Sequence, residues 1–114
     1  MNPLNYFKTT LSRTELKPIL QNLYESKYQG IHTTDGTIHF LKIESQYLND
    51  VTSGKKKAEI RFNDRNFKLG DYIQFIEVKE NELIITSFTV KITHILDDSR
   101  FLKDNFVMLS IMNL

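Results

Sequence analysis

The sequence contains no cysteine and no tryptophan, and only two prolines and four glycines occur among its 114 residues. Without cysteine, the chain can hold no disulfide framework, thiolate zinc site or cysteine nucleophile. No apolar run approaches the ~20 residues of a membrane-spanning helix, and residues 1–11 lack the charged and apolar regions of a signal peptide. These absences predict a soluble, cytoplasmic protein with one modest core.

Sequence motifs of several enzyme classes are missing as well. The chain lacks the glycine-rich loops that bind dinucleotides or phosphates, and it lacks the G-x-S-x-G turn of serine hydrolases. Its three histidines, His32, His39 and His94, do not have the spacing of metal ligands. We therefore expect neither a metal site nor a cofactor.

Positive charge is concentrated in one segment, although the whole chain carries a net charge of only +1. Residues 53–68 contain six basic side chains against two acidic ones, whereas residues 1–52 are balanced and residues 71–104 are acidic. A local basic patch of this size is typical of an anion site or a small nucleic-acid footprint. The alternative is a solvated, lysine-rich strand edge that discourages aggregation.

An amphipathic helix is predicted near the N-terminus. Leu16, Ile19, Leu20 and Leu23 recur at helical spacing, and Gly30 supplies a stop. We expect this helix to form an N-terminal extension, residues 1–30. It would pack on the rest of the protein or offer a surface to a protein partner.

The pattern of residues 31–114 predicts a sheet. Asp35-Gly36 lies between β-prone runs, as in a hairpin, and Ser45 is placed to cap a short helix that ends at Gly54. Further strands are expected at 57–62, 72–78, 83–96 and 106–112. The last of these carries no charge, which favours a position inside the sheet. We predict an α+β fold: a small bent β-barrel of about five or six strands with one inserted helix.

One predicted strand alternates strictly between apolar and charged side chains. The apolar set, assigned to the core, is Ala58, Ile60 and Phe62, and the charged set on the other face is Lys57, Glu59 and Arg61. A carboxylate beside several cations stays ionised, and such a cluster offers acceptors and forked donors to a planar polar ligand such as a base. The alternative is an internal salt-bridge network across the sheet.

The order and spacing of several short motifs resemble the ASCH domains of the PUA-like superfamily, small β-barrels associated with RNA. The likeness is to short bacterial and phage members, and it runs from His39 to Ile111. It rests on H-x-L-K-I from 39 to 43, Tyr47 and Val51, G-K-K-x-x-E-I-R from 54 to 61, N-D-R from 63 to 65, Phe67, G-D at 70 and 71, Thr93, Ile95 and Leu96, and V-x-L-S from 107 to 110.

The resemblance implies a cleft for RNA or a modified nucleoside, bordered by the helix of residues 46–52 and the strand after it. The residues that would line or flank this cleft are Lys42, Tyr47, Lys56, Glu59, Arg61 and Arg65, with Lys55 added from the basic segment. Tyr47 or Phe67 would supply stacking. Strict alternation puts Lys56 and Glu59 on opposite sides, so they can cooperate only if Lys56 precedes the strand or a bulge intervenes.

One ASCH branch removes the acetyl group from acetylated cytidine with a lysine, a threonine and a glutamate. Lys56 falls on that lysine, Glu59 occupies the threonine position, and the glutamate has no counterpart in this sequence. Three hypotheses follow. We prefer a non-catalytic RNA- or nucleotide-binding module. The alternatives are a hydrolase of a modified nucleoside amide, with Lys56 or Glu59 as base, and a protein-interaction module that uses the N-terminal helix or the acidic stretch 77–82.

Overall fold

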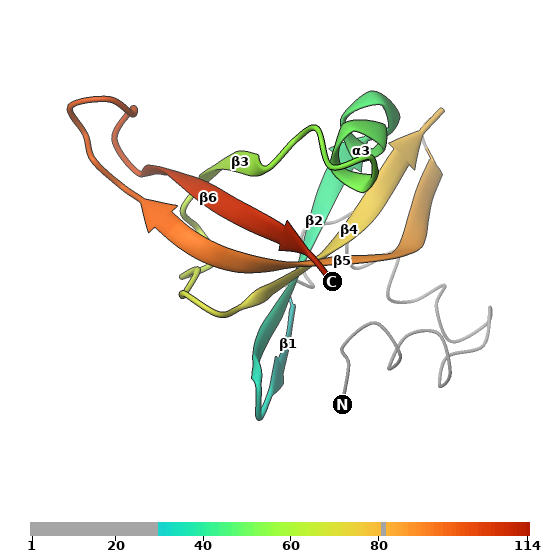
Figure 1. Cartoon of the computed structure of the whole chain (residues 1–114), viewed down its shortest axis with the longest axis horizontal. Coiled ribbons are helices and arrows are strands. Elements are labelled where there is room, and N and C mark those ends of the chain that lie inside the picture. The colour runs from blue at the N-terminus through green and yellow to red at the C-terminus, as the bar shows by residue number, and fades with distance from the viewer. Residues whose placement is uncertain (1–29, 81) are drawn as a thin grey trace.

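A computed structural model describes residues 30–80 and 82–114 of the chain. These residues form a small, sheet-dominated domain with six strands and one helix (Figure 1). The elements are β1 (Gly30–Thr33), β2 (Gly36–Glu44), α3 (Ser45–Thr52), β3 (Ala58–Phe62), β4 (Tyr72–Lys79), β5 (Glu82–Leu96) and β6 (Phe106–Asn113). The predicted N-terminal helix, and with it the proposed extension, lies outside the described residues.

The strands form one bent sheet in the order β1-β2-β4-β5-β6-β3. β2 and β4 pair in parallel because the chain passes through α3 and β3 between them, and every other neighbouring pair is antiparallel. Among the described residues, β1 and β3 are the edge strands and do not pair with each other. The sheet of the described residues is therefore strongly bent but open, and the expectation of a barrel is wrong.

The predicted hairpin and helix are confirmed, with one error in the capping. β1 and β2 pair across a turn at Thr34 and Asp35, and Gly36 follows with φ of 133°. α3 ends at Thr52, two residues before the expected stop at Gly54, which has φ of 80° and donates its N–H to the Val51 carbonyl. Its N-cap is Glu44 rather than Ser45, and no side chain caps it. Packing of α3 against β2 and β4 thus holds the helix in place.

The long and final strands also follow the sequence pattern. β5 spans 15 residues and changes register between Ile92 and His94, which allows it to bend while it pairs with β4 and then with β6. In Figure 1 this orange strand passes beneath much of the domain. β6 lies between β5 and β3, as its lack of charge predicted.

The core lies between α3 and the inner face of the sheet. Its buried members are Leu41, Ile43, Leu48, Val51, Phe67, Ile73, Phe75, Val90, Ile92, Val107, Leu109 and Ile111. Burying each large aliphatic or aromatic side chain contributes about 1.5–3 kcal/mol relative to leaving it exposed. This core fixes α3 and β6, the two elements that flank β3. No helix in the described part of the chain is long and apolar enough to cross a membrane.

The predicted orientation of β3 is wrong. Glu59 and Arg61 lie opposite Leu109 and Val107 of β6, on the face of the sheet that carries the core, and Glu59 is buried. The apolar Ile60 and Phe62 point to the outer face, where 59% and 51% of their surfaces are exposed. The face of β3 that carries Glu59 and Arg61 can turn inward because β3 is an edge strand. At this edge the core gives way to a pocket.

Candidate functional site

Two arginines bridge the gap through which the sheet stays open. β1 begins at Gly30, opposite His39, so among the described residues no strand pairs with the later part of β2 on this side. Arg61 donates from Nη2 to the Lys42 carbonyl at 2.8 Å, and Arg65 donates from Nη1 to the Phe40 carbonyl at 2.7 Å. We call this contact of Arg61 and Arg65 with β2 the arginine seam. Side chains thus join β3 and its following loop to β2, where a closed barrel would use strand pairing.

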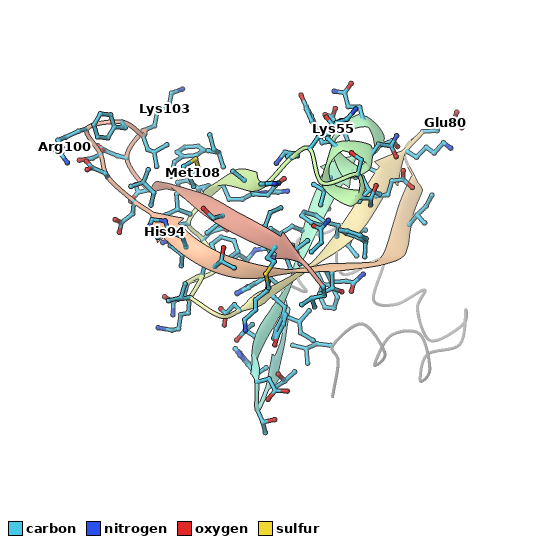
Figure 2. All side chains as sticks on the ribbon, in the orientation of Figure 1. Lys55, Glu80, His94, Arg100, Lys103 and Met108 are labelled. Carbon is cyan, nitrogen blue, oxygen red and sulfur yellow. The ribbon has the colours of Figure 1, made fainter. Side chains whose placement is uncertain are left out.

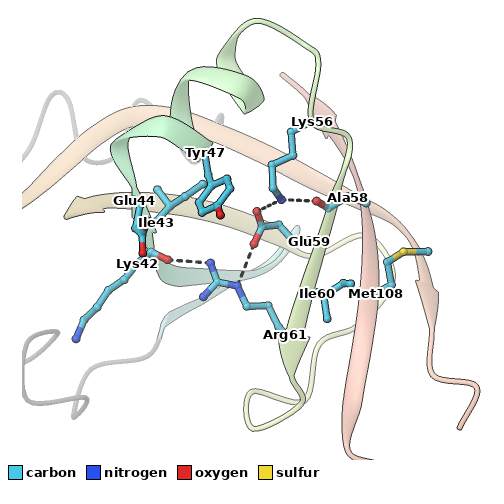
Figure 3. Close-up of a pocket in the computed structure, with 10 residues that line it drawn as sticks. All are labelled: Lys42, Ile43, Glu44, Tyr47, Lys56, Ala58, Glu59, Ile60, Arg61 and Met108. Carbon is cyan, nitrogen blue, oxygen red and sulfur yellow. Dashed lines mark hydrogen bonds and ion pairs between the residues drawn. The ribbon is translucent and has the colours of Figure 1, made fainter. Parts of the chain in front are cut away.

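A pocket of about 600 Å³ opens beside the arginine seam, between β2, α3 and β3. Figure 3 shows its lining residues: Lys42, Ile43, Glu44, Tyr47, Lys56, Ala58, Glu59, Ile60, Arg61 and Met108. The volume lies in the range of small-molecule sites, about 300–1,000 Å³. Its position follows from the fold, because β2 runs directly into α3 and the chain returns through Lys56 to β3.

A buried carboxylate held by two cations forms one wall of the pocket. The Glu59 side chain is only 6% exposed, and its Oε2 accepts a hydrogen bond of 3.0 Å from Arg61 Nε. Lys56 Nζ forms an ion pair with Glu59 Oε1 and also donates to the Ala58 carbonyl. The strand begins at Ala58. Lys56 therefore precedes it, which meets the condition set by the alternation.

The cluster of Lys56, Glu59 and Arg61 keeps hydrogen-bonding capacity for a ligand. A carboxylate offers about four acceptor positions, and a guanidinium has five N–H donors. Within the described residues, Lys56 and Arg61 donate to Glu59, and Arg61 also donates to Lys42. Acceptors of Glu59 and donors of Arg61 thus remain side by side at the pocket.

Tyr47 supplies an aromatic wall. It stands on α3 with 46% of its surface exposed, and Figure 3 shows its ring on the same side of β3 as the Glu59 carboxylate. A half-exposed ring on a helix that the core holds in place can stack on a planar ligand without a large loss of side-chain entropy. The prediction that Phe67 could stack on a ligand is wrong. Phe67 is buried in the core, and its ring centroid lies 4.7 Å from that of His39.

The structure brings together five of the seven predicted site residues. Lys42, Tyr47, Lys56, Glu59 and Arg61 line the pocket, although Figure 3 shows the Lys42 side chain extending away from Glu59. The remaining two do not line it: Lys55 is exposed on the segment after α3, and Arg65 belongs to the arginine seam. Burial lowers the pKa of the Arg65 guanidinium below its ordinary value, and nearby Asp64 opposes that shift.

Sequence reasoning missed five lining residues: Ile43, Glu44, Ala58, Ile60 and Met108. Ile43 and Glu44 are the last two residues of β2 and directly follow Lys42. Because Lys42 was predicted to line the site, its position in the sequence was a signal that could have found them. Met108 joins the pocket only because β6 pairs with β3, with Met108 opposite Ile60. No local signal reveals that long-range pairing.

A second buried polar group lies away from the pocket. His39 Nε2 and Asp71 Oδ2 are 2.8 Å apart, and Asp71 also accepts from the backbone N–H groups of Thr37 and Lys68 at 3.2 and 3.1 Å. Burial lowers the pKa of His39 below 6.5, against the opposing effect of Asp71. This group ties the hairpin to the loop before β4. The described residues contain no group of three or more His, Cys, Asp and Glu side chains suited to a metal ion.

Comparison with known proteins places the pocket inside a described family. A protein of Escherichia phage P2, named as an uncharacterised 12.9 kDa protein in the GpA 3' region, is 34% identical over 67 residues. That match covers 59% of this chain and 62% of the phage protein. Residues 38–111, from β2 to β6, match a family described as a domain of unknown function. The chain belongs to this family, DUF3850.

Proposed function

We propose that the protein binds a nucleotide, free or within RNA, in the pocket between β2, α3 and β3. The observation that carries this proposal is the cluster of Lys56, Glu59 and Arg61, a nearly buried carboxylate with two cations at the wall of a pocket. Placing charges in a protein interior costs free energy that ion pairing offsets only in part. Because this cluster lines a pocket, its charges can interact with a bound ligand, which gives a reason for their presence in the interior.

The chemistry of the cluster suits the edge of a nucleic-acid base. Each base presents hydrogen-bond donors and acceptors next to one another in one plane. Glu59 offers acceptors, and Arg61 offers donors in a planar fork. Tyr47 supplies a ring on which the base can stack. Aliphatic or purely anionic ligands lack N–H donors, so they would not use the acceptors of Glu59.

The resemblance to ASCH domains is part of the same proposal. It implies a cleft bordered by the inserted helix and the next strand, and this pocket is lined from α3 and β3. The arginine seam adds support, because its two side chains join β3 and the next loop to β2 as a barrel would. In this proposal the domain is an open relative of the PUA-like barrels.

Hydrolysis of a modified nucleoside amide is the second candidate. The contact between Lys56 and Glu59 in the pocket favours it, since a paired lysine and carboxylate can move a proton at a bound amide. Hydrolysis also requires a group that stabilises the oxyanion, and Arg61, the other donor to Glu59, would have to supply it. Binding requires none of this, and it is therefore the preferred function.

Calorimetric titration with nucleoside monophosphates tests the proposal. Arg61→Lys keeps the positive charge but removes the planar fork, so we expect affinity to fall about tenfold, as for the loss of a bidentate base contact. Arg100→Lys is the matched control, because Arg100 lies on the loop between β5 and β6, well separated from Lys55 and α3 (Figure 2). Absence of binding at millimolar concentrations, or equal affinities of the two variants, would refute the proposal.

The same titrations separate binding from hydrolysis. Acetylated cytidine is included, and the mixture is analysed for free acetate after the heat has been recorded. If the wild-type protein releases acetate and Lys56→Met does not, the protein is a hydrolase and the preferred function is wrong. Binding without acetate release supports the preferred function.

A further inference from the structure

An exposed apolar block covers the outer face of β3 and β6. Ile60 lies opposite Met108, and Phe62 lies opposite Phe106. The rings of Phe62 and Phe106 meet edge to face, with centroids 5.6 Å apart. We call these four residues the outer block. Ile60 and Phe62 are more than half exposed, which is unusual for two apolar residues on one short strand.

The outer block is continuous with the pocket. Ile60 and Met108 belong to the block, and they also line the pocket. Figure 3 shows them across β3 from Tyr47, so the pocket reaches over this edge strand. Phe62 is the next outward-facing residue after Ile60, about 7 Å along the strand. A ligand that leaves the pocket over β3 therefore meets the Phe62 ring.

The edge of β3 is poorly suited to pairing with another strand. The Lys57 carbonyl accepts from the Ile111 N–H of β6, and the Asn63 N–H donates to the carbonyl of Asn105, the residue before β6. In an antiparallel pair the alternate residues Ala58, Ile60 and Phe62 then turn their backbone groups to the open edge. The Ala58 carbonyl accepts from Lys56, and the Phe62 carbonyl accepts from the Asp64 N–H at 2.9 Å. An incoming strand would have to break both hydrogen bonds. A partner is therefore expected to contact side chains of this edge.

We infer that the ligand is a single-stranded oligonucleotide, with one base in the pocket and its neighbour stacked on Phe62. This inference rests on the proposed function. Phe106 packs edge to face against the Phe62 ring, and Phe62 is still 51% exposed, so the ring offers a surface on which a base can stack. Stacking on such a ring accepts any base. Exposed Lys55 and Lys57 lie on the segment that leads into β3 and carry the charge that the phosphates need.

Comparison of a monophosphate with a trinucleotide of the same base tests the inference. We expect the wild-type protein to bind the trinucleotide about tenfold more tightly, a gain within the range of one base stacked on an aromatic side chain. Phe62→Leu should abolish this gain and leave affinity for the monophosphate unchanged. Phe101→Leu is the control: Phe101 is 75% exposed on the loop between β5 and β6, and its replacement should change neither affinity.

The outcomes separate this inference from the proposed function. Binding of the monophosphate with no gain for the trinucleotide would overturn the inference and leave the proposed function standing. An equal loss of affinity for both ligands in Phe62→Leu would also overturn the inference, because Phe62 would then affect binding through the fold. If neither the monophosphate nor the trinucleotide binds, the proposed function itself is refuted. Self-association without nucleotide, abolished by Phe62→Leu in sedimentation, would assign the outer block to a second copy of the chain.

Discussion

At the scale of single residues, Glu59 shows where sequence patterns stop being informative. Alternation correctly placed Glu59 and Arg61 on one face of β3 and Ile60 and Phe62 on the other. It assigned the wrong face to the core because it assumes that apolar side chains always turn inward. The signal that favoured the true orientation was the pair of cations, Lys56 and Arg61, on either side of Glu59 in sequence.

His39 leads to a prediction about pH. Because burial lowers its pKa in the folded state, the unfolded state binds more protons below about pH 6.5. The contribution of His39 to the free energy of unfolding is therefore fully present above that pH, and it is lost as pH falls through the folded-state pKa. We expect urea unfolding to show this loss in the wild-type protein between pH 7.5 and 5.

His39→Gln removes the titrating ring and keeps an N–H donor for Asp71. At pH 7.5 we expect it to lower the free energy of unfolding by about 1–2 kcal/mol, through lost packing on Phe67. Its stability should then fall less steeply with acid than that of the wild-type protein. His94→Gln, at an exposed position on β5, is the control and should keep the wild-type pH dependence. An unchanged acid response in His39→Gln would contradict the account.

At the scale of elements, the arginine seam explains how β3, at one end of the open sheet, is held against β2 near the other end. Sequence patterns located β2, α3 and β3 to within a few residues because their turn and helix signals are local. The parallel pairing of β2 with β4, and the place of β3 beside β6, depend on contacts between distant segments. Those contacts decide whether a barrel closes, and hence the seam was not predictable.

The arginine seam yields a stability prediction. Arg65→Ala removes the hydrogen bond to the Phe40 carbonyl, and Arg61→Ala removes those to Lys42 and Glu59. We expect each to lower the free energy of unfolding by about 1–3 kcal/mol, as for the loss of a partly buried, charged hydrogen bond. Urea unfolding of the single and double variants measures these losses and their coupling.

The two losses should not be additive, because both arginines hold the same segment against β2 and removal of one loosens the contact of the other. We expect the double variant to lose at least about 0.5 kcal/mol less than the sum of the single variants. Arg100→Ala is the control, since its 78% exposed side chain contacts only its neighbours on the same loop, Asp98 and the Phe101 ring, among the interactions of the described residues. Additive losses, or single losses no larger than that of Arg100→Ala, would show that the seam does not hold β3 against β2.

At the scale of the whole molecule, charge and fold converge on one place. The chain is nearly neutral, but its basic segment surrounds β3, the strand that carries Glu59 into the pocket. The core supports α3 and β6 on either side of this strand. The ligand cannot be read from that arrangement alone, because the same bent sheet can carry different sites. It is the cluster of Lys56, Glu59 and Arg61 that favours a base.

The most direct measurement is an NMR titration of the isotope-labelled protein with a short mixed-sequence RNA and with cytidine monophosphate. We expect the backbone signals that shift to belong to the pocket, from Lys42 to Tyr47 and from Lys56 to Arg61, with the loop of residues 97–105 unchanged. RNA should add shifts at Phe62. Shifts confined to other surfaces, or none at millimolar ligand, would contradict the claim that this pocket binds a nucleotide.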